Sequence, residues 1–211
     1  MPKRYLGNII TDTPTAPAGP YQNDAASGVW SLAEANAYTA AGLWPTAGNL
    51  APRAVFFGGQ STSPTNIIDY VDIGTTGNAT DFGDLDTTRE NFRGAFGSSS
   101  RGVVGGGATS PGDTIQYITF ATIGNAVDFG DLLSTTTQGS GVSNNTRGLF
   151  ANGNAGADSN VIEYVTIAST GNSTDFGDTT QARVQPASHG SETRALFAGG
   201  RQGGSPFTRY N

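Results

Sequence analysis

The sequence predicts a mainly β protein built from repeated units of about 47 residues, each with about four short strands. Glycine supplies 31 of the 211 residues and charged residues only 13%, and β-branched and turn-forming residues outweigh helix formers. Three motifs recur in the same order along residues 53–211. Residues 1–52 lack these motifs, so we expect a separate N-terminal segment.

The first recurring motif is an arginine followed by a short apolar run and one or more glycines. It starts at Arg53, Arg101, Arg147 and Arg194, at spacings of 48, 46 and 47 residues. An apolar run that ends in glycine is typical of a buried strand entering a tight turn. We expect the first strand of each unit here.

The second motif places a tyrosine in an alternating segment, Ile-Asp-Tyr-Val at 68–71, with copies at 115–118 and 162–165. Alternation with period two indicates a strand. A weaker fourth strand is expected before each following arginine, as at 92–96 and 182–184.

The third motif is Gly-Asn followed by Asp-Phe-Gly-Asp, at 77–84, 124–131 and 171–178. Gly and Asn tolerate positive φ, so the pair predicts a turn, and the phenylalanine is expected to be buried. The paired aspartates favour Asx-type turns, with calcium binding as the alternative. The ligand density of a calcium loop is missing, so we expect no metal site.

A single unit has too little apolar surface to fold alone, so neighbouring units are expected to stack. The array resembles kelch-like propeller repeats in its period, glycine pairs and aromatic positions, although it lacks a repeated Trp. Residues 53–211 hold three full units and a partial fourth. Association of copies, a longer product and an open array all remain possible explanations of this count.

The N-terminal segment combines an extended arm with one short helix. A Pro-rich run at 11–20 disfavours a central strand. Ser31 and Glu34 form a capping box, Trp30 is placed to pack onto Ala35, and Gly42 is placed to end the helix.

Five apolar residues of this segment are candidates for docking onto a partner protein. They are Trp30, Leu32, Trp44, Ile9 and Ile10. Tryptophan is enriched at interface centres, which supports docking. The alternative is that both tryptophans pack on their own helix.

Charge and composition exclude several classes. The formal net charge of −6 argues against general nucleic-acid binding. The absence of cysteine excludes disulfides and thiolate sites and fits assembly in a reducing cytoplasm. Neither a signal-like apolar run nor the roughly 20 apolar residues that span a bilayer occur, so we expect no membrane insertion.

The sequence offers no catalytic constellation, so we expect no enzyme and no cofactor. His189 is the single histidine and is expected to lie on a loop. The Asp-Phe-Gly triplets lack the other kinase motifs. The glycines at 105–107 are not followed by Gly-Lys-Ser/Thr, which excludes a phosphate-binding loop.

The four motif arginines have two interpretations. Arg53, Arg101, Arg147 and Arg194 are candidates for a ligand-facing ring that binds a sugar or a carboxylate. The favoured alternative is that each braces a neighbouring turn or pairs with an aspartate of the third motif, because the guanidinium fork suits fixed carboxylates.

The N-terminal segment resembles that of virion structural proteins of tailed bacteriophages, especially cyanophages. The resemblance rests on Tyr-Leu-Gly-Asn-Ile-Ile at 5–10, the Pro-rich run, Gly-Val-Trp-Ser-Leu-Ala-Glu at 28–34 and Ala-Gly-Leu-Trp-Pro at 41–45. Such proteins pair this kind of segment with Gly-rich β-repeats like those at 53–200.

This resemblance implies a virion protein that is assembled in the host cytoplasm together with other virion proteins. It implies a tail-fibre or tail-appendage component, with 1–52 docking to the particle and 53–211 facing outward, and it favours a homotrimer. Contact of the β-repeats with a host surface glycan is left open. The alternative function is capsid decoration or cementing without a receptor role.

Overall fold

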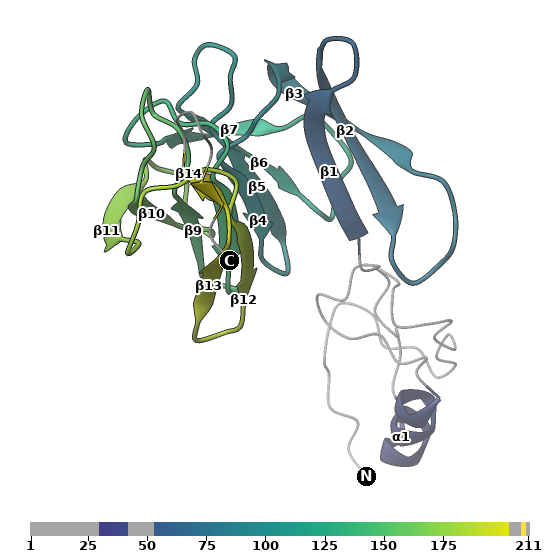
Figure 1. The fold of residues 1–211 in the computed structure, drawn as a ribbon. Coiled ribbons are helices and arrows are strands. Elements are labelled where there is room, and N and C mark those ends of the chain that lie inside the picture. Colours follow the sequence, from purple (N-terminus) through teal and green to yellow (C-terminus); the bar gives the residue numbers. More distant parts are fainter. Residues whose placement is uncertain (1–29, 42–52, 203–207, 210–211) are drawn as a thin grey trace. The chain divides into compact units, whose positions relative to one another are not determined.

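The structure is a computed structural model that describes residues 30–41, 53–202 and 208–209. The chain divides into two units, each described by itself: Met1–Ala54 with Asp72–Gly77, and Val55–Val71 with Asn78–Asn211. The first unit contains the one helix of the described residues, and most strand residues belong to the second (Figure 1). The prediction of a mainly β protein is confirmed.

Helix α1 (Leu32–Ala40) begins where the sequence predicts it. The Glu34 N–H donates to Ser31 Oγ at 3.2 Å, and the Ser31 N–H donates to Glu34 Oε2 at 2.9 Å, which confirms the capping box. Trp30 lies edge-on to Tyr38, with ring centroids 5.3 Å apart. The helix is capped by Ala41 at its C-terminus, and Gly42 and Trp44 lie outside the described residues.

The strands form antiparallel meanders, in which consecutive strands pair with each other. The first sheet contains β1 (Arg53–Gln60), β2 (Pro64–Asp72) and β3 (Thr80–Arg89). The second sheet contains β4 (Gly94–Gly97), β5 (Arg101–Gly105), β6 (Thr114–Thr119) and β7 (Val127–Asp131).

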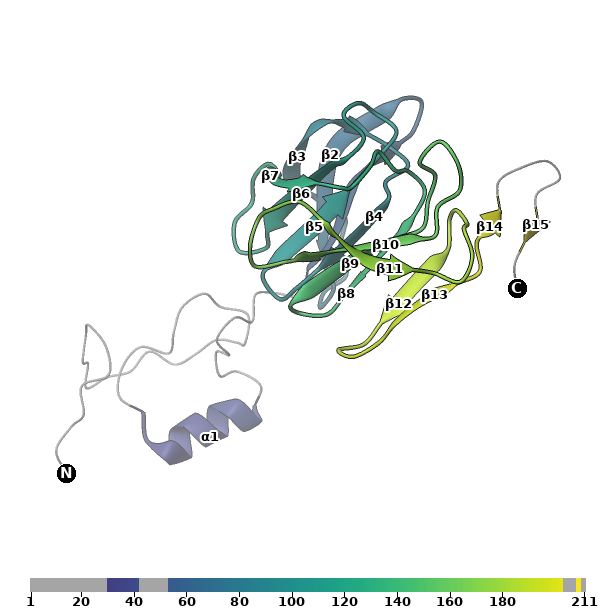
Figure 2. The same cartoon turned by 90° about the vertical axis from the view of Figure 1, so that its left-hand side faces the viewer.

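The third sheet repeats the second one unit later along the chain. It contains β8 (Ser140–Ser143), β9 (Arg147–Ala151), β10 (Val161–Thr166) and β11 (Thr174–Asp178). Two strand pairs follow, β12 (Ala187–Gly190) with β13 (Ala195–Ala198), and β14 (Arg201–Gln202) with β15 (Thr208–Arg209). Figure 2 shows the sheets following one another in chain order.

The fourth strand expected before each motif arginine is present, and it pairs with the strand that follows it. Thus β4 pairs with β5, and β8 with β9. The strand expected at 182–184 is wrong, because these residues make only an isolated bridge at Val184 and the strand is β12. The reason is local: Gln185 adopts a positive φ of 55° and Pro186 has no N–H to donate.

The three sheets share one β-bulge, which places the phenylalanine of the third motif between two paired positions. In the third sheet Ile162 is opposite Gly177 and Glu163 is opposite Asp175, so Phe176 is the extra residue. The first and second sheets shift register at the equivalent residues. The structural repeat therefore extends to an irregularity that the motif did not reveal.

Two apolar clusters hold the sheets together. One contains Ile68, Phe82, Leu85, Val104 and Ile118 and lies between the first and second sheets. The other lies between the second and third sheets and contains Val103, Ile115, Phe129, Leu132, Phe150, Val165 and Ile167. Neighbouring Val103 and Val104 of β5 point into different clusters, so the second sheet buries both faces. This confirms the expectation that the units complete their cores by stacking.

A column of backbone bonds also joins successive units beside the first strand of each sheet. Asn91, Gln138 and Gln185 all adopt positive φ. The Gln138 N–H donates to the Asn91 carbonyl at 3.0 Å, and the Gln185 N–H donates to the Gln138 carbonyl at 2.7 Å. Strands β4, β8 and β12 lie side by side. The described residues show neither a closed ring of sheets nor a kelch repeat.

Candidate functional site

The third motif forms a hydrogen-bonded junction between one sheet and the next. The Gly124 N–H donates to the Phe82 carbonyl at 2.9 Å, and the Ala126 N–H to the Asp84 carbonyl at 2.8 Å. The Asp84 N–H donates in return to the Asn125 side-chain oxygen at 3.1 Å. The segment that contains the Gly-Asn pair of one unit thus binds the Asp-Phe-Gly-Asp strand of the preceding unit.

The same junction recurs between the second and third sheets. The Gly171 N–H donates to the Phe129 carbonyl at 2.7 Å, and the Ser173 N–H donates to the Asp131 carbonyl at 2.8 Å. Asn172 Oδ1 accepts the Asp131 N–H at 3.0 Å. The turn predicted at each Gly-Asn pair is misplaced, because the hydrogen-bonded turns lie earlier, at 72–75, 119–122 and 166–169. The asparagine side chain instead reaches the neighbouring unit.

The glycine of each Asp-Phe-Gly-Asp strand makes this close approach possible. A Cβ on Gly83 or Gly130 would lie 2.5 Å from the backbone of Gly124 or Gly171, respectively. Asx-type hydrogen bonds support the strand: Asp81 Oδ1 accepts the Gly83 N–H at 3.1 Å, and Asp175 makes the equivalent bond. This confirms the Asx interpretation at these two aspartates.

Two of the four motif arginines, Arg101 and Arg147, stack on the tyrosine of their own sheet. The guanidinium of Arg101 lies 4.5 Å from the centre of the Tyr117 ring, and that of Arg147 lies 4.5 Å from the Tyr164 ring. Arg101 Nη1 also donates to the Ile167 carbonyl of the third sheet at 2.9 Å. Arg101 therefore braces the junction with the next sheet.

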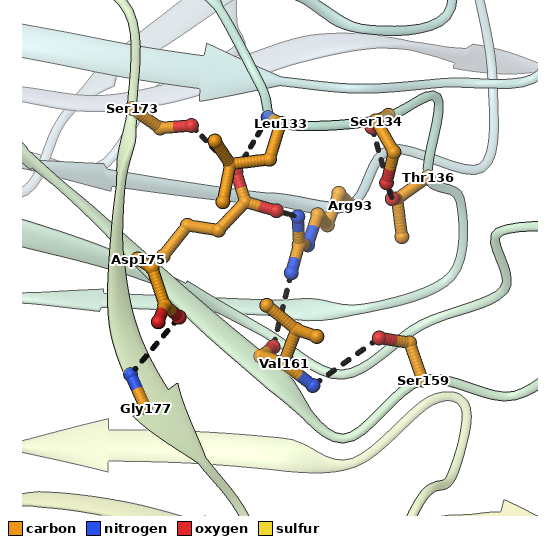
Figure 3. Close-up of polar contacts among 10 residues, drawn as sticks. Arg93, Leu133, Ser134, Thr136, Ser159, Val161, Ser173, Asp175 and Gly177 are labelled. Carbon is orange, nitrogen blue, oxygen red and sulfur yellow. Dashed lines mark hydrogen bonds and ion pairs between the residues drawn. The ribbon is translucent and has the colours of Figure 1, made fainter.

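A buried ion pair crosses the second junction (Figure 3). Arg93 Nη1 donates to Glu163 Oε1, and both side chains are 1% exposed. Arg93 Nη2 donates to the Val161 carbonyl at 3.0 Å. The other carboxylate oxygen, Glu163 Oε2, accepts the Ser173 hydroxyl at 2.5 Å and the Leu133 N–H at 2.9 Å.

The Arg93–Glu163 network holds the two sheets together. Burial lowers the pKa of Arg93, while the charge of Glu163 and its hydrogen bond to the guanidinium oppose that shift. The carboxylate accepts hydrogen bonds from three protein donors, and its side chain is buried, so the pair is not open to solvent. Gln116, the residue equivalent to Glu163 in the second sheet, accepts the Asp86 N–H at 3.4 Å, which corresponds to the bond from Leu133 to Glu163.

Among the residues that the structure describes, nothing covers the face of the third sheet that corresponds to the covered faces of the first two sheets. Phe82 and Phe129 are 1% and 2% exposed, whereas the equivalent Phe176 is 51% exposed. All three rings make the same edge contact with the tyrosine of their own sheet. A Cβ on Gly177 would meet nothing within 4 Å, unlike Gly83 and Gly130.

A cleft of about 370 Å³ lies on this face, between the third sheet and the hairpin of β12 and β13. Its floor includes Leu149, Ile162 and Phe176, and its rim includes Arg147 and Arg194. Two of the four candidate ligand-facing arginines are thus brought together here. We take this cleft and the open face around it as the candidate functional site.

The other predicted residues are placed as follows. Trp30 and Leu32 lie at the start of α1, and Leu32 is exposed. Ile9, Ile10 and Trp44 lie outside the described residues. His189 is not on a loop as expected but on β12, opposite Leu196, because its short strand continues the hairpin with β13.

No family model and no curated protein matches this chain. Among residues 30–41, 53–202 and 208–209, no group of three or more His, Cys, Asp or Glu side chains could hold a metal ion. No helix in the described part of the chain has the length and apolar character needed to cross a bilayer.

Proposed function

We propose that the chain is a structural component of a bacteriophage virion, in a tail fibre or tail appendage, whose β-repeat array faces the host. The observation that best supports this proposal is the junction between sheets. It occurs twice, between the first and second and between the second and third sheets, with the same hydrogen bonds and a buried apolar cluster each time. Repeated junctions of this kind make a stiff array. The resemblance of the N-terminal segment to virion proteins supports the particle assignment.

The arrangement of the sheets supports a propeller-type geometry as the finer fold. Each complete sheet is a four-stranded meander, and the first strands of successive sheets, β4, β8 and β12, are neighbours. In propellers the blades are four-stranded sheets arranged around a common channel. A density map of the assembled protein that shows sheets in a straight stack would refute this geometry.

Localisation on intact particles tests the proposed function. We expect cryo-electron microscopy of particles labelled on this protein to place it in the tail, and purified protein to reduce adsorption to host cells. Density on the capsid lattice with unchanged adsorption would instead support capsid decoration.

Removal of residues 1–52 tests the attachment role of the N-terminal segment. The truncated array is expected to fold with an unchanged β-type circular dichroism spectrum and to be absent from purified particles. Incorporation of the truncated protein would contradict the docking of Trp30, Leu32, Trp44, Ile9 and Ile10 onto the particle. Native mass spectrometry of the full chain tests the expected trimer.

A further inference from the structure

We propose that the open face of the third sheet is a docking site for a β-hairpin from another polypeptide, one that carries the Tyr strand and the Gly-Asn, Asp-Phe-Gly-Asp segment of this repeat. This site does not depend on the proposed virion function. At the two junctions inside the chain, the equivalent faces of the first and second sheets bind such hairpins.

The free edge of β13 is the first element of the site. Its equivalents β5 and β9 each pair on one side with β4 or β8 and on the other with β6 or β10. Among the described residues, β13 pairs with β12 alone. Arg183 Nη2 donates to the Phe197 carbonyl at 2.8 Å, and an added strand would replace this contact with backbone hydrogen bonds.

The apolar floor is the second element. In the covered junction, Val165 and Ile167 of the incoming hairpin pack in one cluster with Ile115 and Phe129. The open face presents Ile162 and Phe176 at the equivalent positions, and both line the cleft. A hairpin with apolar residues at the positions of Val165 and Ile167 would therefore bury Phe176 as Phe129 is buried.

Polar groups on the site match the hairpin at three further points. Asp178 is equivalent to Asp84 and Asp131, whose N–H groups each donate to the asparagine of the next unit. Arg147 is equivalent to Arg101, which donates to the Ile167 carbonyl just after the Tyr strand. At the rim, Arg194 occupies the position from which Arg101 and Arg147 stack on a tyrosine. A docked hairpin supplies a partner to each.

A peptide of residues 160–179 is the direct probe, because it contains the hairpin that closes the second junction. Full-length protein is titrated into fluorescently labelled peptide, and anisotropy reports binding. We expect saturable binding, weakened about tenfold or more by Phe176→Asp in the protein. Leu133→Asp is the matched control, because Leu133 is 55% exposed and the equivalent residue of the first unit is Asp86.

Peptide variants test the register of docking. Asn172→Ala and Val165→Asp in the peptide are each expected to weaken binding to the unchanged protein, whereas a scrambled peptide should not bind. Equal affinity for the scrambled peptide, or no binding by the unchanged peptide, would overturn the proposal. Amide hydrogen exchange gives a separate readout: β13 amides that are already protected without peptide would show that another segment of the chain occupies the edge.

Disulfide trapping locates the hairpin, since the chain contains no native cysteine. Protein carrying Asp178→Cys is mixed with peptide carrying Asn172→Cys, and a mixed disulfide is expected on non-reducing gels. Protein carrying Asp84→Cys is the control, because Asn125 already lies at that position. Equal trapping at both positions would contradict docking on the open face.

Discussion

The second and third sheets have nearly the same structure but different neighbours. Both are four-stranded meanders with the same bulge and the same contact between tyrosine and phenylalanine. They differ in what covers the face that follows in the chain: Phe129 is buried under the third sheet, and Phe176 borders an open cleft. The geometry of each sheet is therefore set within its own unit, whereas the burial of its phenylalanine is set by the neighbouring unit.

The largest effect is expected from breaking the buried Arg93–Glu163 ion pair of the second junction. Glu163→Ala leaves the Arg93 guanidinium buried without its carboxylate, and such a loss costs about 3–5 kcal/mol in the free energy of unfolding. Urea denaturation measures this. Gln116→Ala removes the equivalent side chain of the first junction, which is uncharged and forms no ion pair itself. Equal losses for the two variants would show that the pair adds nothing specific to its junction.

The matched phenylalanines test the comparison most directly. Phe129→Ala removes a buried ring and is expected to cost about 3–5 kcal/mol in the free energy of unfolding. Phe176→Ala removes a half-exposed ring of the same bulge and should cost clearly less in the free protein. Urea titrations of the two variants measure the two losses in the free energy of unfolding. Comparable losses would mean that the face around Phe176 is covered in solution.

The glycines beside these rings separate backbone strain from crowding. Gly130 and Gly177 have similar φ values of 144° and 134°, so alanine at either position strains the backbone by about 1–3 kcal/mol. Only at Gly130 does the new Cβ also meet the backbone of Gly171, which adds about 1–3 kcal/mol of overpacking. Thermal unfolding of the two variants should therefore place Gly130→Ala lower. Identical midpoints would contradict a close junction at Gly171.

The sequence was sufficient for the parts of this pattern that are local. The 47-residue period and the capping box at Ser31 are visible in neighbouring residues, and both are seen in the structure. The strand misplaced at 182–184 shows the limit, because Gln185 is not a residue type that signals positive φ.

The contacts between units could not be predicted in the same way. Arg93 and Glu163 lie 70 residues apart, and neither belongs to a position that repeats with the same residue type. Arg101 and Arg147 were expected to brace a neighbouring turn or to pair with an aspartate, because charge was the visible signal. Their guanidinium groups stack on tyrosines, because the strands of one sheet bring these two motifs face to face.

The smallest effect on stability is expected from the protonation of Asp86 at the first junction. Burial disfavours the ionised carboxylate of Asp86, but hydrogen bonds from Gln116 and Arg89, together with the charge of Arg89, outweigh it and lower the pKa of Asp86. A carboxyl whose pKa is lower in the folded state stabilises the protein above its unfolded pKa of about 3.9. That stabilisation disappears as the pH falls through the lower, folded value.

Urea midpoints measured between about pH 7 and pH 2 test this expectation, because Asp86→Asn removes the titrating group. The variant should lose less stability than the unchanged protein over the acid range. The difference should be small, because the Asp86 side chain is 44% exposed and solvent screens its pair with Arg89. The second sheet carries Leu133 at this position, so the acid-sensitive contribution belongs to the first junction. A parallel acid response of the two proteins would show that Asp86 does not stabilise that junction.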